Sequence, residues 1–249
     1  MTSQRQVRIA AVGDLHFDSQ RRGHLLEMFS VIGREANVLV LCGDLTTHGH
    51  ANQMEAFVEE LQGVDIPIVA VLGNHDFEAD EESVLCDILI ERGVHVLDGS
   101  SVEIEGIGFA GVKGFGGGFG RWALGPFGER IYKEFVQAAI EEELKLETAL
   151  RTLRTETRVA ILHYSPIPDT LKGEPAEIFP FLGSSRLLPP IETYGVDVVF
   201  HGHAHIGTPH GLTPGGITVY NVAMSVLEKS TGSPYRIWTT NAPDRRKEA

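Results

Sequence analysis

Unbroken apolar runs alternate with helix-like stretches through the first part of the chain. The apolar runs predict strands at residues 7–12, 38–42, 66–72 and 94–97. Most of them have the near-continuous apolar character of strands that are buried on both faces of a parallel sheet. The stretches between them predict helices at residues 25–35, 52–62 and 83–92. This repeated strand–helix order implies right-handed crossovers and a mostly parallel sheet.

The second part of the chain has a different pattern. Two runs at 101–104 and 107–112, separated by Glu105 and Gly106, predict an antiparallel hairpin. A glycine-rich segment at 114–120 precedes a long amphipathic helix at 129–155, and buried strands are predicted at 159–163 and 196–200. Two antiparallel strands, 217–221 and 236–240, are expected to close the fold. No internal repeat or linker interrupts the pattern, which therefore predicts one domain over residues 1–249.

Polar residues follow five of the predicted strands. In open α/β sheets, the loops beyond the carboxyl ends of the strands form the ligand-binding crevice. The strand ends would bring these motifs to one rim: Asp14-x-His16, Gly43-Asp44, Gly73-Asn74-His75-Asp76, His163 and Gly202-His203-x-His205. Each motif alone is compatible with an ordinary turn or helix cap. Together they predict a metal site, because imidazole, carboxylate and amide oxygen suit borderline divalent ions.

The number of candidate ligands indicates more than one ion. One tetrahedral ion cannot use all of them. Two ions about 3.5–4 Å apart, bridged by a shared carboxylate, accommodate the whole set. The sequence therefore predicts a binuclear centre.

The ordered motifs closely resemble those of the calcineurin-like metallophosphoesterases, from residue 8 to about residue 222. The resemblance implies an α/β fold, a four-layer α-β-β-α sandwich of two mixed sheets flanked by helices. It implies that His75 binds no metal, contacts the phosphate and assists the leaving group. Asp76, the second catalytic candidate, either orients the His75 imidazole or caps the following helix. The implied ligands are Asp14, His16, Asp44 and His205 for one ion, and Asp44, Asn74, His163 and His203 for the other.

The resemblance implies a binuclear metal-dependent phosphoesterase that uses a metal-bridging hydroxide. Manganese is the first expectation for the ions, with iron, zinc or cobalt as alternatives. The segment after Asp44 lacks the arginine of the protein phosphatase branch, and no added DNA-facing region is evident. The expected substrate is a small phosphomonoester or phosphodiester, with nucleotides among the candidates. The alternative is a catalytically silent scaffold, which the presence of every motif histidine disfavours.

Composition and charge limit the classes of binding partner and the cellular location that we expect. The chain has 21 Lys and Arg against 34 Asp and Glu, a formal net charge of −13. Nucleic-acid-binding proteins usually present a basic face, so no extensive nucleic-acid surface is expected. No apolar run approaches the about 20 residues that span a bilayer, so no membrane partner is expected. With two cysteines and no visible signal peptide, a reduced, cytoplasmic protein is expected.

The segment at 165–184 directly follows the candidate ligand His163 and contains four prolines. Loops of this length without regular structure tend to be functional in compact domains. We expect this segment to discriminate among substrates and to contribute little to metal binding. Lys172 within it offers a cation for a phosphate or another acidic group of the substrate, although an ordinary exposed lysine is the favoured explanation.

Overall fold

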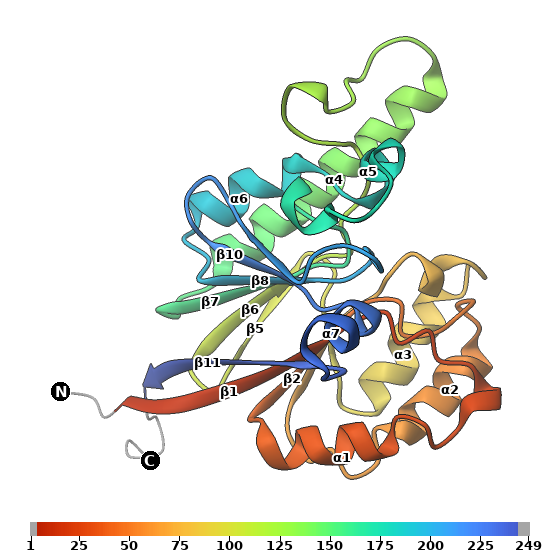
Figure 1. Ribbon diagram of the computed structural model, residues 1–249, viewed down its shortest axis with the longest axis vertical. Coiled ribbons are helices and arrows are strands. Elements are labelled where there is room, and N and C mark those ends of the chain that lie inside the picture. The colour runs from red at the N-terminus through yellow and green to blue at the C-terminus, as the bar shows by residue number, and fades with distance from the viewer. Residues whose placement is uncertain (1–3, 244–249) are drawn as a thin grey trace.

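The computed structural model describes residues 4–243, which form two β-sheets packed face to face (Figure 1). The first sheet has the strand order β11 (Arg236–Pro243), β1 (Gln4–Val12), β2 (Val38–Cys42), β3 (Ile68–Val71) and β4 (His95–Val96). All neighbours in it are parallel except β11, which runs antiparallel to β1. The four strands predicted for the first part of the chain are thus confirmed as a parallel unit.

The second sheet has six strands. Their order is β5 (Ser100–Ile104), β6 (Ile107–Gly111), β7 (Thr157–Ile161), β8 (Val198–His201), β10 (Thr218–Asn221) and β9 (His210–Leu212). The β5–β6 pair is the predicted antiparallel hairpin. Strands β6, β7, β8 and β10 run parallel to one another, and β9 runs antiparallel to β10. Both sheets are therefore mixed, as the family resemblance implied.

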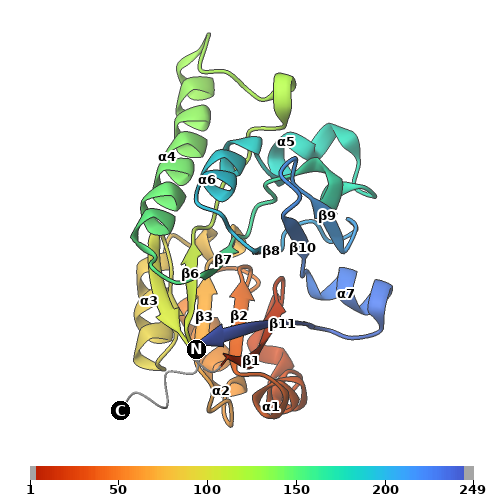
Figure 2. The same ribbon diagram turned by 90° about the vertical axis from the view of Figure 1, so that its left-hand side faces the viewer.

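Helices cover the outer face of each sheet. The first sheet is covered by α1 (Leu26–Glu35), α2 (Ala51–Glu60) and α3 (Glu82–Glu91). The second is covered by α4 (Arg130–Thr152) and α6 (Leu188–Thr193). Figures 1 and 2 show these two groups on opposite sides of the paired sheets. A further helix, α7 (Met224–Thr231), lies on the side away from α4 (Figure 2).

The hydrophobic core is divided by the sheets into three layers. Ile9 and Phe109 lie between the two sheets, Phe57 lies between the first sheet and its helices, and Leu150 lies between the second sheet and α4. Alternate residues of one strand therefore enter different layers, and both faces of each sheet are apolar. This explains the unbroken apolar runs in the sequence and confirms the four-layer sandwich.

Two expectations for the C-terminal part are wrong. Strand β10 pairs parallel with β8 and not antiparallel, and its antiparallel partner β9 was not predicted. Parallel strands need a long crossover connection, which residues 202–217 supply. Segment 165–184 contains 3₁₀ turns at Pro168–Leu171 and Ala176–Ile178 and the short helix α5 (Phe179–Leu182), so it is not irregular throughout. Pro168 and Pro180 occupy the first positions of helical turns, where the missing N–H costs nothing.

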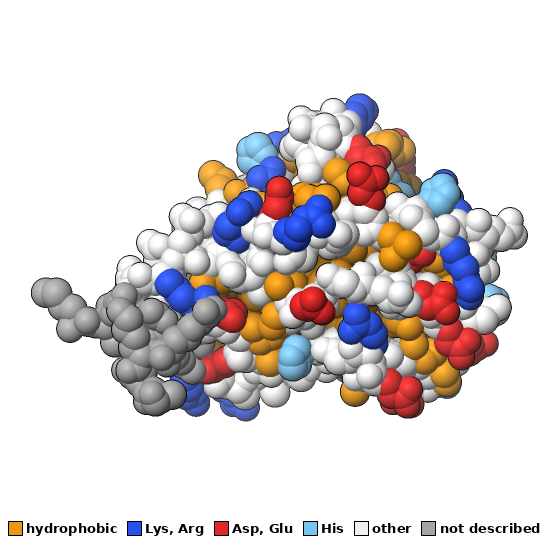
Figure 3. Space-filling view, turned by 90° about the horizontal axis from the view of Figure 1, so that it is seen from below, with side chains coloured by type: hydrophobic (Ala, Val, Ile, Leu, Met, Phe, Trp, Pro, Cys, Tyr) orange, Lys and Arg blue, Asp and Glu red, His pale blue; other side chains and the backbone are white. Residues whose placement is uncertain are grey.

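The surface carries charges of both signs. On the face shown in Figure 3, Lys and Arg side chains are interspersed with Asp and Glu. Among residues 4–243, no helix combines the length and the apolar character that crossing a membrane requires.

Candidate metal centre

All seven predicted metal ligands lie just beyond the carboxyl ends of strands. Asp14 and His16 follow β1, Asp44 follows β2 and Asn74 follows β3 in the first sheet. In the second sheet, His163 follows β7, and His203 and His205 follow β8. Six of these residues fall into two groups of possible metal ligands, in each of which the ligand atoms lie within 4.8 Å of one another. Asp44 belongs to both groups.

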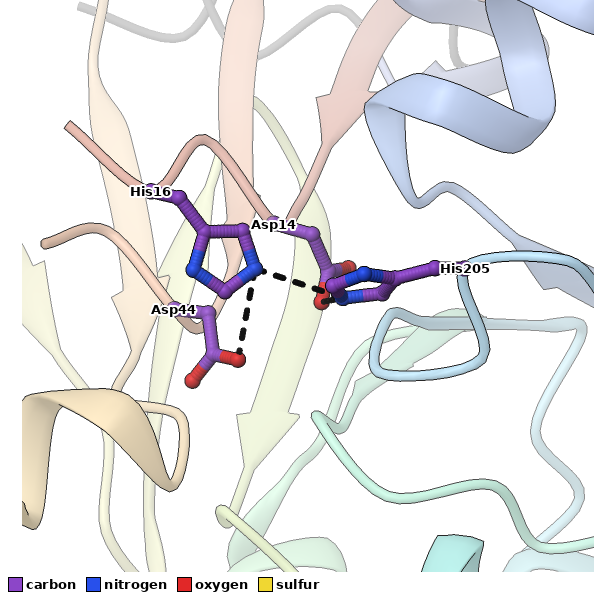
Figure 4. A group of neighbouring side chains, drawn as sticks. All are labelled: Asp14, His16, Asp44 and His205. Atoms are coloured by element: carbon purple, nitrogen blue, oxygen red, sulfur yellow. Dashed lines mark hydrogen bonds and ion pairs between the residues drawn. The ribbon is translucent and has the colours of Figure 1, made fainter. Parts of the chain in front are cut away.

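The first group consists of Asp14, His16, Asp44 and His205 (Figure 4). The Nε2 atoms of His16 and His205 lie 3.3 Å apart. His205 Nε2 is 2.9 Å from Asp14 Oδ1, and His16 Nε2 is 3.8 Å from Asp44 Oδ2. Two imidazole nitrogens and two carboxylates thus point toward a common point.

The second group consists of Asp44, His163 and His203, and Asn74 joins it. His163 Nε2 lies 2.8 Å from Asn74 Oδ1 and 3.4 Å from Asp44 Oδ1. The His163 and His203 rings lie with their centroids 4.8 Å apart. The two oxygens of Asp44 therefore face different groups, Oδ1 the second and Oδ2 the first.

The hydrogen bonds of His163 and His203 leave one ring nitrogen of each with a free lone pair. A carbonyl oxygen only accepts, so His163 Nδ1 donates to the Cys42 carbonyl at 2.9 Å and its Nε2 carries the lone pair. By the same reasoning, His203 Nε2 donates to the Phe181 carbonyl at 3.2 Å and its Nδ1 carries the lone pair. His163 Nε2 then carries no proton, and it faces Oδ1 of Asn74 and Oδ1 of Asp44. A cation fits this arrangement of acceptors.

Burial keeps three of the imidazoles neutral, the form that binds metals. It lowers the pKa of His16 to about 4 and that of His203 to about 3, and it lowers the pKa of His163 well below its usual value. Burial, with the neighbouring carboxylates Asp14 and Asp76, raises the pKa of Asp44 to about 9. Within residues 4–243, Asp44 Oδ2 also has no hydrogen-bond partner. A negative charge on Asp44 therefore requires a nearby cation, which two divalent ions would provide.

Backbone strain is concentrated at the same residues. Asp14, His16, Asp44 and His203 have positive φ angles between 42° and 69°, a region that non-glycine residues seldom adopt. Such strain persists where the surrounding structure enforces it and is common at functional sites. Packing explains why a glycine precedes Asn74: a Cβ at Gly73 would collide with the Asp44 carboxylate.

His75 lies beside the first group and outside both. Its ring centroid is 4.7 Å from that of His16. Its Nδ1 donates to the Thr47 carbonyl at 2.8 Å, which leaves Nε2 for a substrate, and Glu78 Oε2 lies 3.5 Å from Nδ1. The predicted separation of His75 from the ligand groups is thus present in the structure.

Asp76 has neither of the two positions expected for it. Its carboxylate is fully buried and accepts hydrogen bonds from three backbone amides and the Thr46 hydroxyl. The amide donors are Gly73, Leu45 and Thr46, at 2.8, 3.2 and 2.9 Å. Thr47, and not Asp76, orients the His75 imidazole, which corrects the catalytic assignment. Asp76 instead joins the loops after β2 and β3 that carry Asp44 and Asn74.

We expect Asp76→Ala to lower the free energy of unfolding by about 3 kcal/mol or more, because each of the three amides would lose a buried acceptor. Urea denaturation of the metal-free protein measures this effect. Asp87→Ala, at an exposed position of α3, is the matched control and should change little. Equal stability of the two variants would contradict the role of Asp76 in joining the loops.

Segment 165–184 contacts the histidine loop that follows β8, and the expectation that it contributes little to metal binding stays a prediction. Besides the Phe181 carbonyl that holds His203, the Thr170 hydroxyl lies 2.8 Å from Nε2 of the buried His201. The Glu174 carboxylate accepts from the Ile206 amide at 2.8 Å. No sequence motif marks these supporting residues, because their contacts depend on how the loop folds back over β8.

Comparisons with known proteins agree with the geometry. A family model described as calcineurin-like phosphoesterase matches residues 7–207. A phosphopantetheinyl hydrolase from Mycobacterium tuberculosis has a similar structure, with a TM-score of 0.64, 16% identity and coverage of 96% of each chain. The protein TT1561 of Thermus thermophilus has a TM-score of 0.55 and 15% identity, covering 95% of this chain and 99% of that one.

A third similar structure is GAP50, the anchor in the inner membrane complex of Plasmodium. Its TM-score is 0.52 with 14% identity, covering 88% of this chain and 72% of that one. At these identities the likeness concerns the fold alone. No curated protein sequence matches the chain.

Proposed function

Because the chain belongs to the calcineurin-like phosphoesterase family, we propose that it is a binuclear metal-dependent phosphoesterase acting on a small phosphomonoester or phosphodiester. One observation carries this proposal: the two oxygens of Asp44 face two separate groups of ligand atoms. Manganese is the first candidate for both ions, and iron, zinc and cobalt are the alternatives. A cytoplasmic location stays a prediction, with which the free cysteines Cys42 and Cys86 agree.

The residues of the chain divide the work of hydrolysis. Bound divalent ions would supply positive charge for the phosphoryl oxygens and activate water near neutral pH. Asp44 would contribute one oxygen to each ion. Asp14, His16 and His205 would complete the ligands of one ion, and Asn74, His163 and His203 those of the other. His75 Nε2, the nitrogen that Thr47 leaves free, would donate a proton to the leaving oxygen.

A substrate panel with added manganese tests the activity. We expect hydrolysis of p-nitrophenyl phosphate or bis-p-nitrophenyl phosphate by the manganese-loaded protein, and loss of that activity on chelation. Nucleotides, cyclic nucleotides and phosphopantetheine esters belong in the panel as candidate natural substrates. The phosphopantetheine esters are included because a hydrolase named for that group shares the fold.

Manganese should also stabilise the folded protein. At a free concentration 100 times its Kd, each ion adds about 2.7 kcal/mol to the free energy of unfolding. Thermal unfolding with and without manganese measures the shift, and magnesium is the comparison ion. Stabilisation by manganese without hydrolysis of any panel member would favour the scaffold alternative. Absence of both effects would contradict the metal centre itself.

A further inference from the structure

A sixth strand end reaches the edge of the sheets where the candidate ligands lie. Strand β6 runs parallel to β7, so its carboxyl end points the same way as the end that carries His163. The residue there is Lys113. Its carbonyl accepts hydrogen bonds from the amides of His163 and Tyr164, each at 3.0 Å. Lys113 is thus fixed beside the second ligand group by its backbone.

Three aromatic rings surround the ammonium of Lys113. Its Nζ lies 5.1 Å from the ring centroids of Phe77 and Phe115 and 5.3 Å from that of Tyr164. Two of these rings belong to the segments that carry the site, since Phe77 is two residues after His75 and Tyr164 directly follows His163. The Tyr164 ring also contacts that of His203, with centroids 4.4 Å apart. The rings therefore hold the cation close to the metal ligands.

The ammonium has hydrogen-bonding capacity to spare. Its hydrogen bond within residues 4–243 is to the Gly114 carbonyl, at 3.2 Å, although an ammonium has three donors. No carboxylate of that range comes within ion-pair distance of it. Two acidic side chains near it, Asp98 and Glu142, are both paired with Lys145 at 2.9 Å. Glu82 lines the same pocket as Lys113, and Asp44 attracts the ammonium from the ligand groups. Lys113 is half-buried and forms no ion pair within residues 4–243, so an anionic ligand would complete its surroundings.

We propose that Lys113 binds substrate, its ammonium donating hydrogen bonds to a non-bridging oxygen of the phosphoryl group. This inference rests on the proposed phosphoesterase function and adds to it a phosphate-binding cation that belongs to the protein. In a chain with a net charge of −13, such a cation would help to select the anionic group before and during hydrolysis. The aromatic rings keep it in place and leave its unused donors for the phosphate.

Lys172, the lysine that the sequence offered for this role, is the matched control. It is exposed and forms an ion pair with Asp169. Lys113→Met retains an apolar stem of similar length and removes the charge, and Lys172→Met makes the same change elsewhere. The probe is inorganic phosphate, measured as a competitive inhibitor of p-nitrophenyl phosphate hydrolysis and by direct calorimetric binding to the manganese-loaded protein.

We expect Lys113→Met to weaken phosphate binding by about 10–100-fold, the value of a hydrogen bond to a charged group. Manganese content should be unchanged, and thermal stability should be equal or higher because a half-buried charge that forms no ion pair within residues 4–243 is removed. Lys113→Arg should restore most of the affinity, whereas Lys172→Met should bind phosphate like the wild type. Should the methionine variant not fold, Lys113→Gln gives the same readout, with the same loss expected.

The inference and the proposed function fail in different ways. A wild-type protein that neither holds manganese nor hydrolyses the ester refutes the proposed function, and the inference with it. An active wild type whose Lys113→Met variant binds phosphate with unchanged affinity refutes the inference alone. The Lys113→Met variant could also lose manganese or unfold at a lower temperature while each manganese-loaded site binds phosphate with normal affinity. That result would assign Lys113 a structural role and would also refute the inference.

Discussion

Asp44→Asn is expected to lose both bound metal ions. The variant should be less stable than the wild type with manganese present and more stable than the wild type without it. The variant loses the negative charge of the one residue that belongs to both ligand groups. Binding of both ions should therefore weaken together. Loss of an outer-shell partner already costs about 10–100-fold in metal affinity or activity. Loss of a shared ligand should exceed that range in kcat/KM.

In the metal-free protein the same substitution should stabilise the fold. Burial and the neighbouring carboxylates raise the pKa of Asp44 to about 9, far above its value in the unfolded chain. An acid whose pKa is raised on folding makes the protein less stable as pH rises from the unfolded pKa toward the folded one. At neutral pH, removing this acid should therefore raise the melting temperature, and the advantage over the wild type should grow between pH 4 and pH 9.

Thermal unfolding at several pH values, with and without manganese, tests both parts of this expectation. Metal-free Asp44→Asn should melt above the metal-free wild type, and manganese should reverse the order. Asp65→Asn, at an exposed position before β3, is the matched control and should show neither effect. A variant that retains two ions would show that Asp44 is not the shared ligand. A metal-free variant less stable than the metal-free wild type would contradict the raised pKa of Asp44.

His75→Ala should separate chemistry from metal binding. The His75 ring packs edge-to-face on His16 but belongs to neither group of ligand atoms. The hydrogen bond to Asp44 Oδ1 comes from the His75 backbone amide, which alanine keeps. Manganese content should therefore be that of the wild type. Loss of a general acid lowers kcat by about 10²–10⁴-fold. The loss should be smaller for p-nitrophenyl esters, whose leaving group needs little protonation, than for alkyl esters.

Steady-state kinetics on matched aryl and alkyl phosphate esters measure this dependence on the leaving group. His50→Ala is the control, because His50 is an exposed histidine nearby whose ring faces Glu81. An equal loss with both esters would exclude His75 as the proton donor. Loss of manganese from the variant would place His75 among the ligands.

The ligand set could be predicted because its position follows from the sheet. Apolar runs identify the strands, and the residue after a buried parallel strand must lie at the carboxyl edge. Asp14, Asp44 and His163 all obey this rule. The same rule identifies Lys113, whose strand the sequence placed correctly in a hairpin. Its parallel pairing with β7, which brings the lysine to the ligand edge, depends on the second sheet as a whole.

Other contacts were beyond the sequence because they depend on how loops fold back. The order Asn-His-Asp does not show that the Asp76 carboxylate accepts hydrogen bonds from three backbone amides and not from the His75 ring. Likewise, the prolines of segment 165–184 indicated a restricted loop but not that Phe181 would hold His203. The segment that we expect to discriminate among substrates also holds His203, so variants of that segment should be checked for metal content before selectivity is interpreted.

The manganese content of the purified wild-type protein tests the binuclear centre most directly. Protein saturated with manganese and freed of excess ion by gel filtration should contain two ions per chain by elemental analysis, since Asp44 presents one oxygen to each ligand group. One ion or fewer per chain, with every ligand residue intact, would contradict the shared-carboxylate centre.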